Sequence, residues 1–212
     1  MTTVDELMDK LYGKNIWNEV IPLPYHMEQY NDWSNELREI MEETWPSVIV
    51  ELGSWYGFSA ITMAAIADEI GLGTTIICID NWLGSIEHWH PKNRHQLMIR
   101  DGYPTIYRQF MSNVKHMGHS RTIMPIPMGT LAGLRWLEQN GVEAGLIYVD
   151  ASHDSWDVYA DLKHAYEILG PRGVICGDDY YWDSVKESVD RFADELGFQV
   201  SSNEIGYFWR SL

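Results

Sequence analysis

The chain has 212 residues, of which 45% are hydrophobic and 13% are aromatic. This apolar content excludes a disordered or fibrous protein, and the length fits one globular domain over residues 1–212. The 31 acidic residues outnumber the 15 Lys and Arg, which gives a net charge of −16. Because this charge repels phosphate groups and anionic lipids, the sequence predicts neither a nucleic-acid partner nor a membrane partner.

The cysteines and the first residues bear on the compartment. Cys78 and Cys176 lie within apolar runs, and residues 1–10 lack the basic flank and apolar stretch of a secretion signal. We therefore expect a cytoplasmic protein without disulfide bonds.

Residues 1–46 are predicted to form a helical extension. Thr3 and Glu6 have the spacing of a capping box, which predicts a short peripheral helix ending near Tyr12. A second helix, packed on the core, is predicted from apolar residues at helical spacing, namely Leu37, Ile40, Met41 and Trp45.

From residue 47 onward, apolar runs alternate with helical patterns. Strands are predicted at residues 47–52, 74–80, 121–126, 145–150 and 173–178. Helices are predicted at residues 58–70, 130–140 and 183–196, and a further helix is predicted to end at Leu169, before Gly170 and Pro171. This alternation is typical of a parallel sheet with helices on both faces, an α/β fold. Two short strands at 198–201 and 205–210 predict a terminal hairpin.

Residues 81–120 interrupt this alternation with histidines, aromatic residues and little periodicity before about residue 104. An insertion of this length is often a lid or a substrate-binding segment. An ordinary helix preceded by a long surface loop is the alternative.

A small-molecule pocket is predicted where the parallel strands end. Gly53 and Gly57 allow a tight turn and a close approach of a ligand to the backbone. Glu51 occupies the position of the first glycine in a dinucleotide-binding motif, where a carboxylate repels pyrophosphate and attracts an ammonium or sulfonium group. Asp80, at the end of the next strand, is placed to accept hydrogen bonds from a ribose.

The run E-L-G-S-W-Y-G from Glu51, with Asp80 one strand later, resembles the class I S-adenosylmethionine-dependent methyltransferases. The resemblance, which covers residues 47–212, implies a Rossmann-like, doubly wound sheet of seven strands, mostly parallel with the last strand antiparallel. It also implies that the methionyl part of the cofactor lies over Gly53 to Gly57, the ribose on Asp80, and the adenine near Trp82 and the Met128-Gly129-Thr130 turn. The implied cofactor-binding residues are Glu51, Gly53, Ser54, Tyr56, Gly57, Ser59, Asp80, Asn81, Trp82, Gly129, Thr130 and Asp150.

A narrower resemblance is carried by Y-V-D-A-S-H-D-S-W from Tyr148 and G-V-I-C-G-D-D-Y from Gly173. Both runs resemble the metal-dependent, macrocin O-methyltransferase-like enzymes that methylate sugar hydroxyls on macrolide and aminocoumarin antibiotics. The resemblance implies a divalent cation on Asp150, Asp178 and Asp179, with His153 as the catalytic base and Asp150 beside it. Three carboxylates without a soft ligand suit Mg²⁺, which can hold a hydroxyl and lower its pKa.

Other interpretations of these residues stay open at this stage. Asp178 or Asp179 could cap the helix that begins near residue 183, and His153 could be a surface residue. Catechol methyltransferases have a lysine after the acid of the fourth strand, where this chain has Ser152 and His153, which argues against a catechol acceptor.

The sequence thus predicts an S-adenosylmethionine-dependent O-methyltransferase, assisted by Mg²⁺, that acts on a hydroxyl of a small molecule or glycan. An NAD-dependent oxidoreductase and a non-catalytic cofactor-binding module are the alternatives. Residues predicted to line the acceptor pocket are Trp82, His88, Trp89, His90, Tyr180, Tyr181 and Trp182. Related sugar methyltransferases often assemble through their N-terminal regions, and a homodimer is expected on that ground alone, since the resemblance itself does not extend to residues 1–46.

Overall fold

The structure is a computed structural model that describes residues 3–27, 33–203 and, by their backbone, 206–210. Its sheet contains β1 (Val48–Leu52), β2 (Thr75–Asp80), β3 (Ile123–Pro127), β4 (Ala144–Val149), β5 (Leu169–Asp178), β6 (Ser201–Ser202) and β7 (Gly206–Arg210). The strand order is β3-β2-β1-β4-β5-β7-β6. Strands β1 to β5 run parallel to one another, and β7 pairs antiparallel with β5. The predicted α/β fold with a parallel central sheet is confirmed.

The strand order reverses direction at β1, which pairs with β2 on one side and β4 on the other. Every residue of β1 is buried, as expected for a strand covered on both faces. Glu51 lies beside Cys78 of β2 and Tyr148 of β4, so its carboxyl is enclosed by neighbouring strands. The carboxyl ends of β1, β2 and β4 therefore converge where ligands bind in open parallel sheets.

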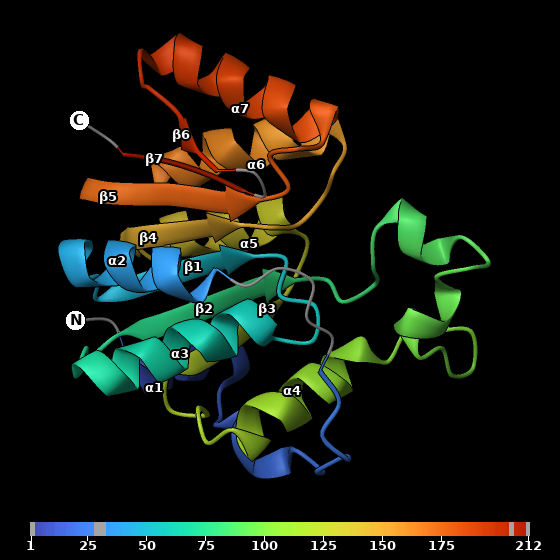
Figure 1. Ribbon diagram of the computed structural model, residues 1–212. Helices are drawn as coiled ribbons and strands as arrows, with labels where there is room; N and C mark the ends of the chain where they lie inside the picture. Colours follow the sequence, from blue (N-terminus) through green and yellow to red (C-terminus); the bar gives the residue numbers. More distant parts are fainter. Residues whose placement is uncertain (1–2, 28–32, 204–205, 211–212) are drawn as a thin grey trace.

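Helices cover both faces of the sheet. Figure 1 shows α2 (Ser34–Thr44) and α3 (Phe58–Ile70) in front of the sheet, with α5 (Thr130–Gln139) and α6 (Ser155–Glu167) behind it. The last helix, α7 (Asp183–Leu196), packs against α6. The bounds of α3 and α7 agree with those predicted from the sequence.

The first helix, α1 (Val4–Tyr12), corrects one prediction. Its Thr3–Glu6 capping box is present, but Leu7 and Met8 are fully buried, so the helix is part of the core and not peripheral. The Tyr12 hydroxyl donates to the carbonyl oxygen of Pro125 in β3 at 2.7 Å. Apolar residues on one helix face therefore bury against β3, which a nine-residue pattern alone does not reveal.

Two further predicted boundaries differ from the structure. Gly170 and Pro171 were expected to end a helix, but β5 begins at Leu169, whose pairing with Ala144 precedes a register shift. The predicted strand at 198–201 is reduced to Ser201–Ser202, and Ile205, predicted to begin the last strand, lies outside the described residues.

Within residues 81–120, the structure places two short 3₁₀ helices, η2 (Ile86–Trp89) and η3 (Arg94–Leu97), before α4 (Ile106–His116). Figure 1 shows the segment between β2 and α4 extending outward beyond the carboxyl ends of the strands. We call residues 83–103 the lid segment.

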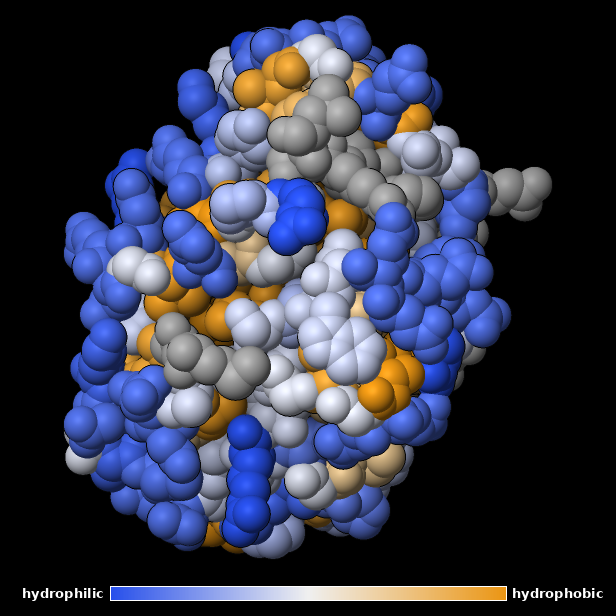
Figure 2. Space-filling view, turned by 90° about the vertical axis from the view of Figure 1, so that its left-hand side faces the viewer, coloured by the Kyte–Doolittle hydropathy of each residue, from blue (hydrophilic) through white to orange (hydrophobic). Residues whose placement is uncertain are grey.

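The opposite face, formed at the amino ends of the strands, is shown in Figure 2, where hydrophilic side chains surround small apolar patches. Among the described helices, none combines the length and the apolar character that crossing a membrane requires.

Candidate functional site

The turn from β1 to α3 is shaped by two glycines in the left-handed region, Gly53 with φ 82° and Gly57 with φ 94°. A Cβ on Gly53 would lie 2.0 Å from the carbonyl oxygen of Asp150. The glycine is therefore required because the ends of β1 and β4 approach each other, and not only to admit a ligand, as the sequence suggested. Gly57 caps the amino end of α3, where a Cβ would lie 3.0 Å from the Phe110 ring.

Glu51 is buried at the end of β1. Its Oε1 accepts a hydrogen bond from the Ser59 hydroxyl at 2.5 Å, whereas its Oε2 has no hydrogen-bond partner in the described part of the chain. The Ser54 hydroxyl oxygen is also buried without a partner there. Burial raises the pKa of Glu51 to about 6. Orphaned buried polar atoms of this kind call for an explanation, and a ligand with an ammonium group supplies one.

Asp80 holds the same turn from the end of β2. Its Oδ2 accepts from the backbone N–H groups of Ser54 at 3.0 Å and Trp55 at 2.9 Å. Its Oδ1 accepts from the N–H of Trp82 at 2.6 Å. Burial raises the pKa of Asp80, and these three N–H donors oppose that effect. Asp80, the residue predicted to bind the ribose, therefore also holds the turn from β1 to α3, which we call the cofactor turn.

Two predicted cofactor-binding side chains point into the interior instead. Trp82 is 2% exposed, and its ring packs against Tyr107 and Phe110 with ring centroids 4.7 Å and 4.9 Å away. Tyr56 is 1% exposed and donates its hydroxyl to the carbonyl oxygen of Gln96 at 2.7 Å. The Trp82 ring is therefore part of the core and not a stacking surface for adenine or an acceptor, and Tyr56 anchors the lid segment.

The remaining predicted cofactor residues lie at the ends of β2 and β3. Asn81 is exposed, and its Oδ1 accepts from the N–H of Leu83 at 2.7 Å. Gly129 precedes α5 with open space around its Cα, while the Thr130 hydroxyl donates to Asp161 of α6 at 2.6 Å. Asp161 is 2% exposed, and burial raises its pKa to about 7. The Thr130 hydroxyl is thus engaged by a buried carboxyl that the sequence pattern did not single out.

An acidic cluster lies beside this turn. Ligand atoms of Asp150, His153 and Asp179 lie within 4.8 Å of one another, close enough to hold one metal ion. Burial, together with the charges of Asp178 and Asp179, raises the pKa of Asp150 far above its usual value. A cation would relieve this repulsion between carboxylates, so the donor set fits a hard divalent ion.

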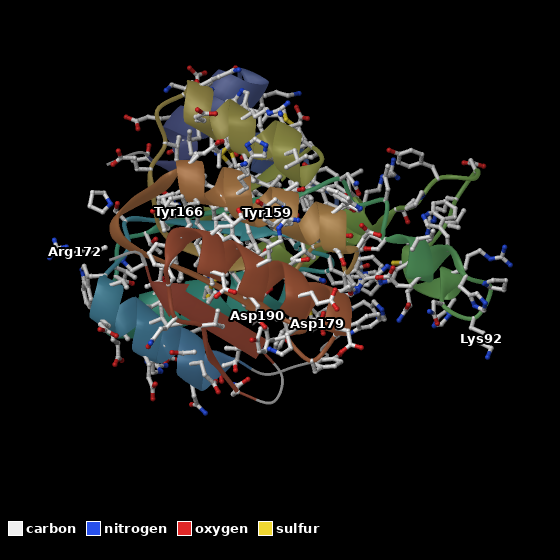
Figure 3. The ribbon with its side chains drawn as sticks, turned by 90° about the horizontal axis from the view of Figure 1, so that it is seen from above. Lys92, Tyr159, Tyr166, Arg172, Asp179 and Asp190 are labelled. Carbon is white, nitrogen blue, oxygen red and sulfur yellow. The ribbon has the colours of Figure 1, made fainter. Side chains whose placement is uncertain are left out.

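Asp178 lies beside this group but is not part of it. Its Oδ1 accepts from the N–H of Asp179 at 2.7 Å, and Asp179 adopts a left-handed conformation with φ 62°. The helix-capping alternative for the two acids is wrong, because Trp182 occupies the N-cap of α7 and no side chain caps that helix. Seen from above, Asp179 lies toward the lid segment, while Arg172 of β5 lies at the far end of the molecule (Figure 3).

His153 is held between two carboxylates. Its Nε2 lies 2.6 Å from Oδ2 of Asp179, and its Nδ1 lies 3.0 Å from Oε1 of Glu87 in the lid segment. Burial lowers the pKa of His153, but Asp179 and Glu87 outweigh it, so the pKa is raised. The Trp182 ring stacks on the imidazole at 4.6 Å and 17°. Sequence patterns did not reveal Glu87, since it lies in a segment without periodicity.

Of the predicted acceptor-binding residues, His88 packs against Trp55, with ring centroids 4.2 Å apart and ring planes tilted by 31°. Trp89 is 43% exposed and donates its indole N–H to Leu83. His90 is exposed in the lid segment. Tyr181 is 59% exposed and Trp182 42% exposed after the acidic pair, so these rings are accessible at the site.

A comparison with protein families gives the class of this protein. The family model described as "Methyltransferase domain" matches residues 50–180, which is more than half of the chain. The chain therefore belongs to this methyltransferase family and is an enzyme that transfers methyl groups. No curated protein sequence gives a significant match.

Solved structures share the fold at low sequence identity. An O-methyltransferase from Bacillus cereus in complex with SAH has 15% identity and a TM-score of 0.61, covering 98% of this chain and 96% of that one. TomG from Streptomyces achromogenes, an O-methyltransferase involved in tomaymycin synthesis, solved with SAM, has 14% identity and a TM-score of 0.62, covering 99% and 95%. CalS11, a TDP-rhamnose 3′-O-methyltransferase of calicheamicin biosynthesis, has 15% identity and a TM-score of 0.58, covering 84% and 77%.

Proposed function

We propose that the chain is an S-adenosylmethionine-dependent O-methyltransferase that methylates a hydroxyl of a small molecule or sugar with the help of a divalent cation. The observation that carries this proposal is the contact between the two strand ends. The Cα of Gly53 lies so close to the Asp150 backbone that the predicted cofactor turn and the acidic cluster border one another. A methyl donor and a metal-held hydroxyl bound at these two places would be neighbours.

The cofactor fits the residues of the turn. The unpartnered Oε2 of Glu51 and hydroxyl of Ser54 would hold the ammonium and polar end of the methionyl part. Asp80, which accepts from three backbone N–H groups, would receive the ribose. When bound, S-adenosylmethionine supplies the methyl group and leaves as S-adenosylhomocysteine.

Asp150 and Asp179 are the carboxylates we propose to hold the cation, with Asp178 as an adjacent third. Mg²⁺ bound there would lower the pKa of the acceptor hydroxyl. His153 would accept the proton of that hydroxyl at Nε2 while its Nδ1–H stays directed at Glu87. Asp179, 2.6 Å from Nε2, would stabilise the imidazolium formed when His153 takes up that proton.

The acceptor is proposed to be a hydroxyl of a small molecule or sugar. The net charge of −16 disfavours nucleic acid, and the names of the structurally similar proteins include a sugar-nucleotide methyltransferase. Exposed Trp182, beside His153, is suited to contact a sugar ring or another flat surface.

We propose that residues 1–212 form one domain in which residues 81–120 select the acceptor. We also propose that residues 1–46 support a homodimer and that the protein acts in the cytoplasm.

The test is a calorimetric titration of S-adenosylhomocysteine into the protein, with Mg²⁺ and again in EDTA. Micromolar binding supports the cofactor, and a metal-dependent heat supports the acidic cluster. Transfer of labelled methyl groups from S-adenosylmethionine to a panel of sugars and vicinal diols then tests the acceptor class. Absence of binding under both conditions, together with binding of NADH, would overturn the proposal in favour of an oxidoreductase.

A further inference from the structure

Glu87 is the carboxylate through which the lid segment contacts the proposed base. It lies in η2, and its Oε1 is 3.0 Å from Nδ1 of His153, 66 residues further along the chain. The Glu87 side chain is 33% exposed and that of His153 21% exposed, so the contact is partly shielded from water. A charge-assisted hydrogen bond in such a place is stronger than one on an open surface.

The backbone around Glu87 is fixed by contacts to both strand-end loops. The Ser85 hydroxyl donates to the carbonyl oxygen of Ala151 at 3.4 Å, and the His88 ring packs against the Trp55 ring. The carbonyl oxygen of Glu87 itself accepts from the Asn93 side chain at 3.1 Å. The η2 turn thus spans the cofactor turn and the loop after β4, with the Glu87 carboxylate aimed at the imidazole between them.

The other sides of His153 are held by different elements. Trp182 stacks on the ring, Asp179 contacts Nε2, and the Ser184 hydroxyl donates to the backbone oxygen of His153 at 2.6 Å. These partners restrict the position of the ring but leave Nδ1 to Glu87. A base that accepts a proton at Nε2 needs its other nitrogen to carry a hydrogen, and the acceptor at Nδ1 decides this.

We propose that Glu87 is a positioning residue: from the lid segment it holds the Nδ1–H of His153 and thereby keeps Nε2 on the side of Asp179 and the acidic cluster, where the acceptor hydroxyl is proposed to bind. His153 then has its Nδ1 partner only when the lid segment is in place beside the proposed acceptor site. This inference rests on the proposed function, since it assigns a role within the same site. The inference adds to the proposed function that a residue of the lid segment positions the base that accepts the proton.

The test follows the Nδ1 proton of His153 by NMR of protein labelled with ¹⁵N-histidine, with S-adenosylhomocysteine and Mg²⁺ present. His153→Gln assigns the signal. In Glu87→Leu, and in Glu87→Asp, which keeps the charge but is one methylene shorter, we expect the Nδ1 proton to exchange with solvent at least tenfold faster. Glu87→Gln, whose amide oxygen can still accept, should retain slower exchange. Lys92→Gln, at the outer end of the same lid segment, is the matched control and should behave like the wild type (Figure 3).

Kinetics with an acceptor from the methyl-transfer panel give the second readout. The Leu and Asp variants should lose at least tenfold in kcat, with KM for S-adenosylmethionine and the dissociation constant of S-adenosylhomocysteine within twofold of wild type. Unchanged Nδ1 exchange and unchanged kcat in both variants would overturn the inference. Failure of the wild type to bind S-adenosylhomocysteine would instead overturn the proposed function, so the two failures are distinguishable.

Discussion

The Ser59 hydroxyl donates to Oε1 of Glu51 at 2.5 Å, and Oε2 of the same buried carboxyl has no partner within the described residues. Ser59 is the second residue of α3, so the first helix after β1 supplies a partner to one oxygen of the carboxyl only. Burial raises the pKa of Glu51 to about 6, because no cation compensates its charge there. A ligand ammonium at Oε2 would do so.

This relationship predicts that cofactor affinity depends on pH. Ammonium binding favours the ionised carboxyl, so affinity should be full above pH 6 and should fall as pH decreases through the Glu51 pKa of about 6. At pH 5 the dissociation constant of S-adenosylhomocysteine should be about tenfold higher than at pH 8. Calorimetry across this range measures it. Glu51→Gln should bind weakly at every pH, and a constant wild-type affinity from pH 5 to 8 would contradict the assignment.

Gly53→Ala should destabilise the protein through the Asp150 contact. The added Cβ would lie 2.0 Å from a backbone oxygen, and Gly53 has φ 82°, which L side chains rarely adopt. We expect the free energy of unfolding to fall by about 2 kcal/mol or more. Gly73→Ala is the matched control, because its Cβ meets nothing within 4 Å, and it should change the free energy of unfolding by less than about 1 kcal/mol. Urea unfolding of both variants measures this difference. Equal changes in the free energy of unfolding would show that the ends of β1 and β4 can move apart at little cost.

The order of strands and helices was readable from the sequence because buried parallel strands leave apolar runs. The helix 58–70 ends at Gly71, which adopts φ 72°, and the helix 183–196 ends at Gly197 with φ 75°, so glycine marked both ends correctly. Asp150 and Asp179 could be placed together because parallel strands end at one edge.

Contacts that form between distant segments could not be predicted in this way. The burial of Trp82 depends on Phe110 and Tyr107 of α4, and the Tyr56 hydroxyl reaches Gln96 40 residues away. Neither partner leaves a periodic signal beside the residue it fixes. Glu87 likewise lies in a short 3₁₀ turn whose docking on the strand-end loops decides its role. Local sequence patterns identify helices and strands, whereas the burial and contacts of the side chains at the site depend on how those elements pack.

Asp179→Asn should weaken binding of a divalent cation. The acidic cluster contains Asp150, His153 and Asp179, so loss of one carboxylate charge removes part of the attraction for the cation and leaves a neutral amide oxygen as a weaker ligand. Mn²⁺ titration monitored by electron paramagnetic resonance should show at least a tenfold weaker affinity for Asp179→Asn and Asp150→Asn. Asp194→Asn, in the last turn of α7, is the control and should bind as the wild type does. Asp178→Asn tests whether the adjacent acid contributes. If both Asp179→Asn and Asp150→Asn bound Mn²⁺ with wild-type affinity, the proposed metal site would be wrong.

The hydrogen bond between Thr130 and Asp161 should matter more at high pH than at low pH. Burial raises the pKa of Asp161 from 3.8 to about 7, so its contribution to stability is fully present below pH 4 and is lost as pH rises through 7. The Thr130 hydroxyl opposes this loss, because its hydrogen bond at 2.6 Å stabilises the ionised carboxylate. Thr130→Val should therefore cost about 1.5–3 kcal/mol of unfolding free energy at pH 8, and about 0.5–1.5 kcal/mol at pH 5, where Asp161 is protonated.

Thr44→Val provides the matched control for this experiment. The Thr44 hydroxyl donates to the uncharged carbonyl oxygen of Ile40 at 2.7 Å, so its removal should cost the same at both pH values. Urea unfolding of the two variants and the wild type at pH 5 and pH 8 gives the comparison. A Thr130→Val cost that is equal at the two pH values would mean that Asp161 does not change its ionisation state between pH 5 and pH 8. Because Thr130 begins α5 at the turn proposed to receive the adenine, a confirmed pH dependence would also predict looser binding of S-adenosylhomocysteine in Thr130→Val at pH 8.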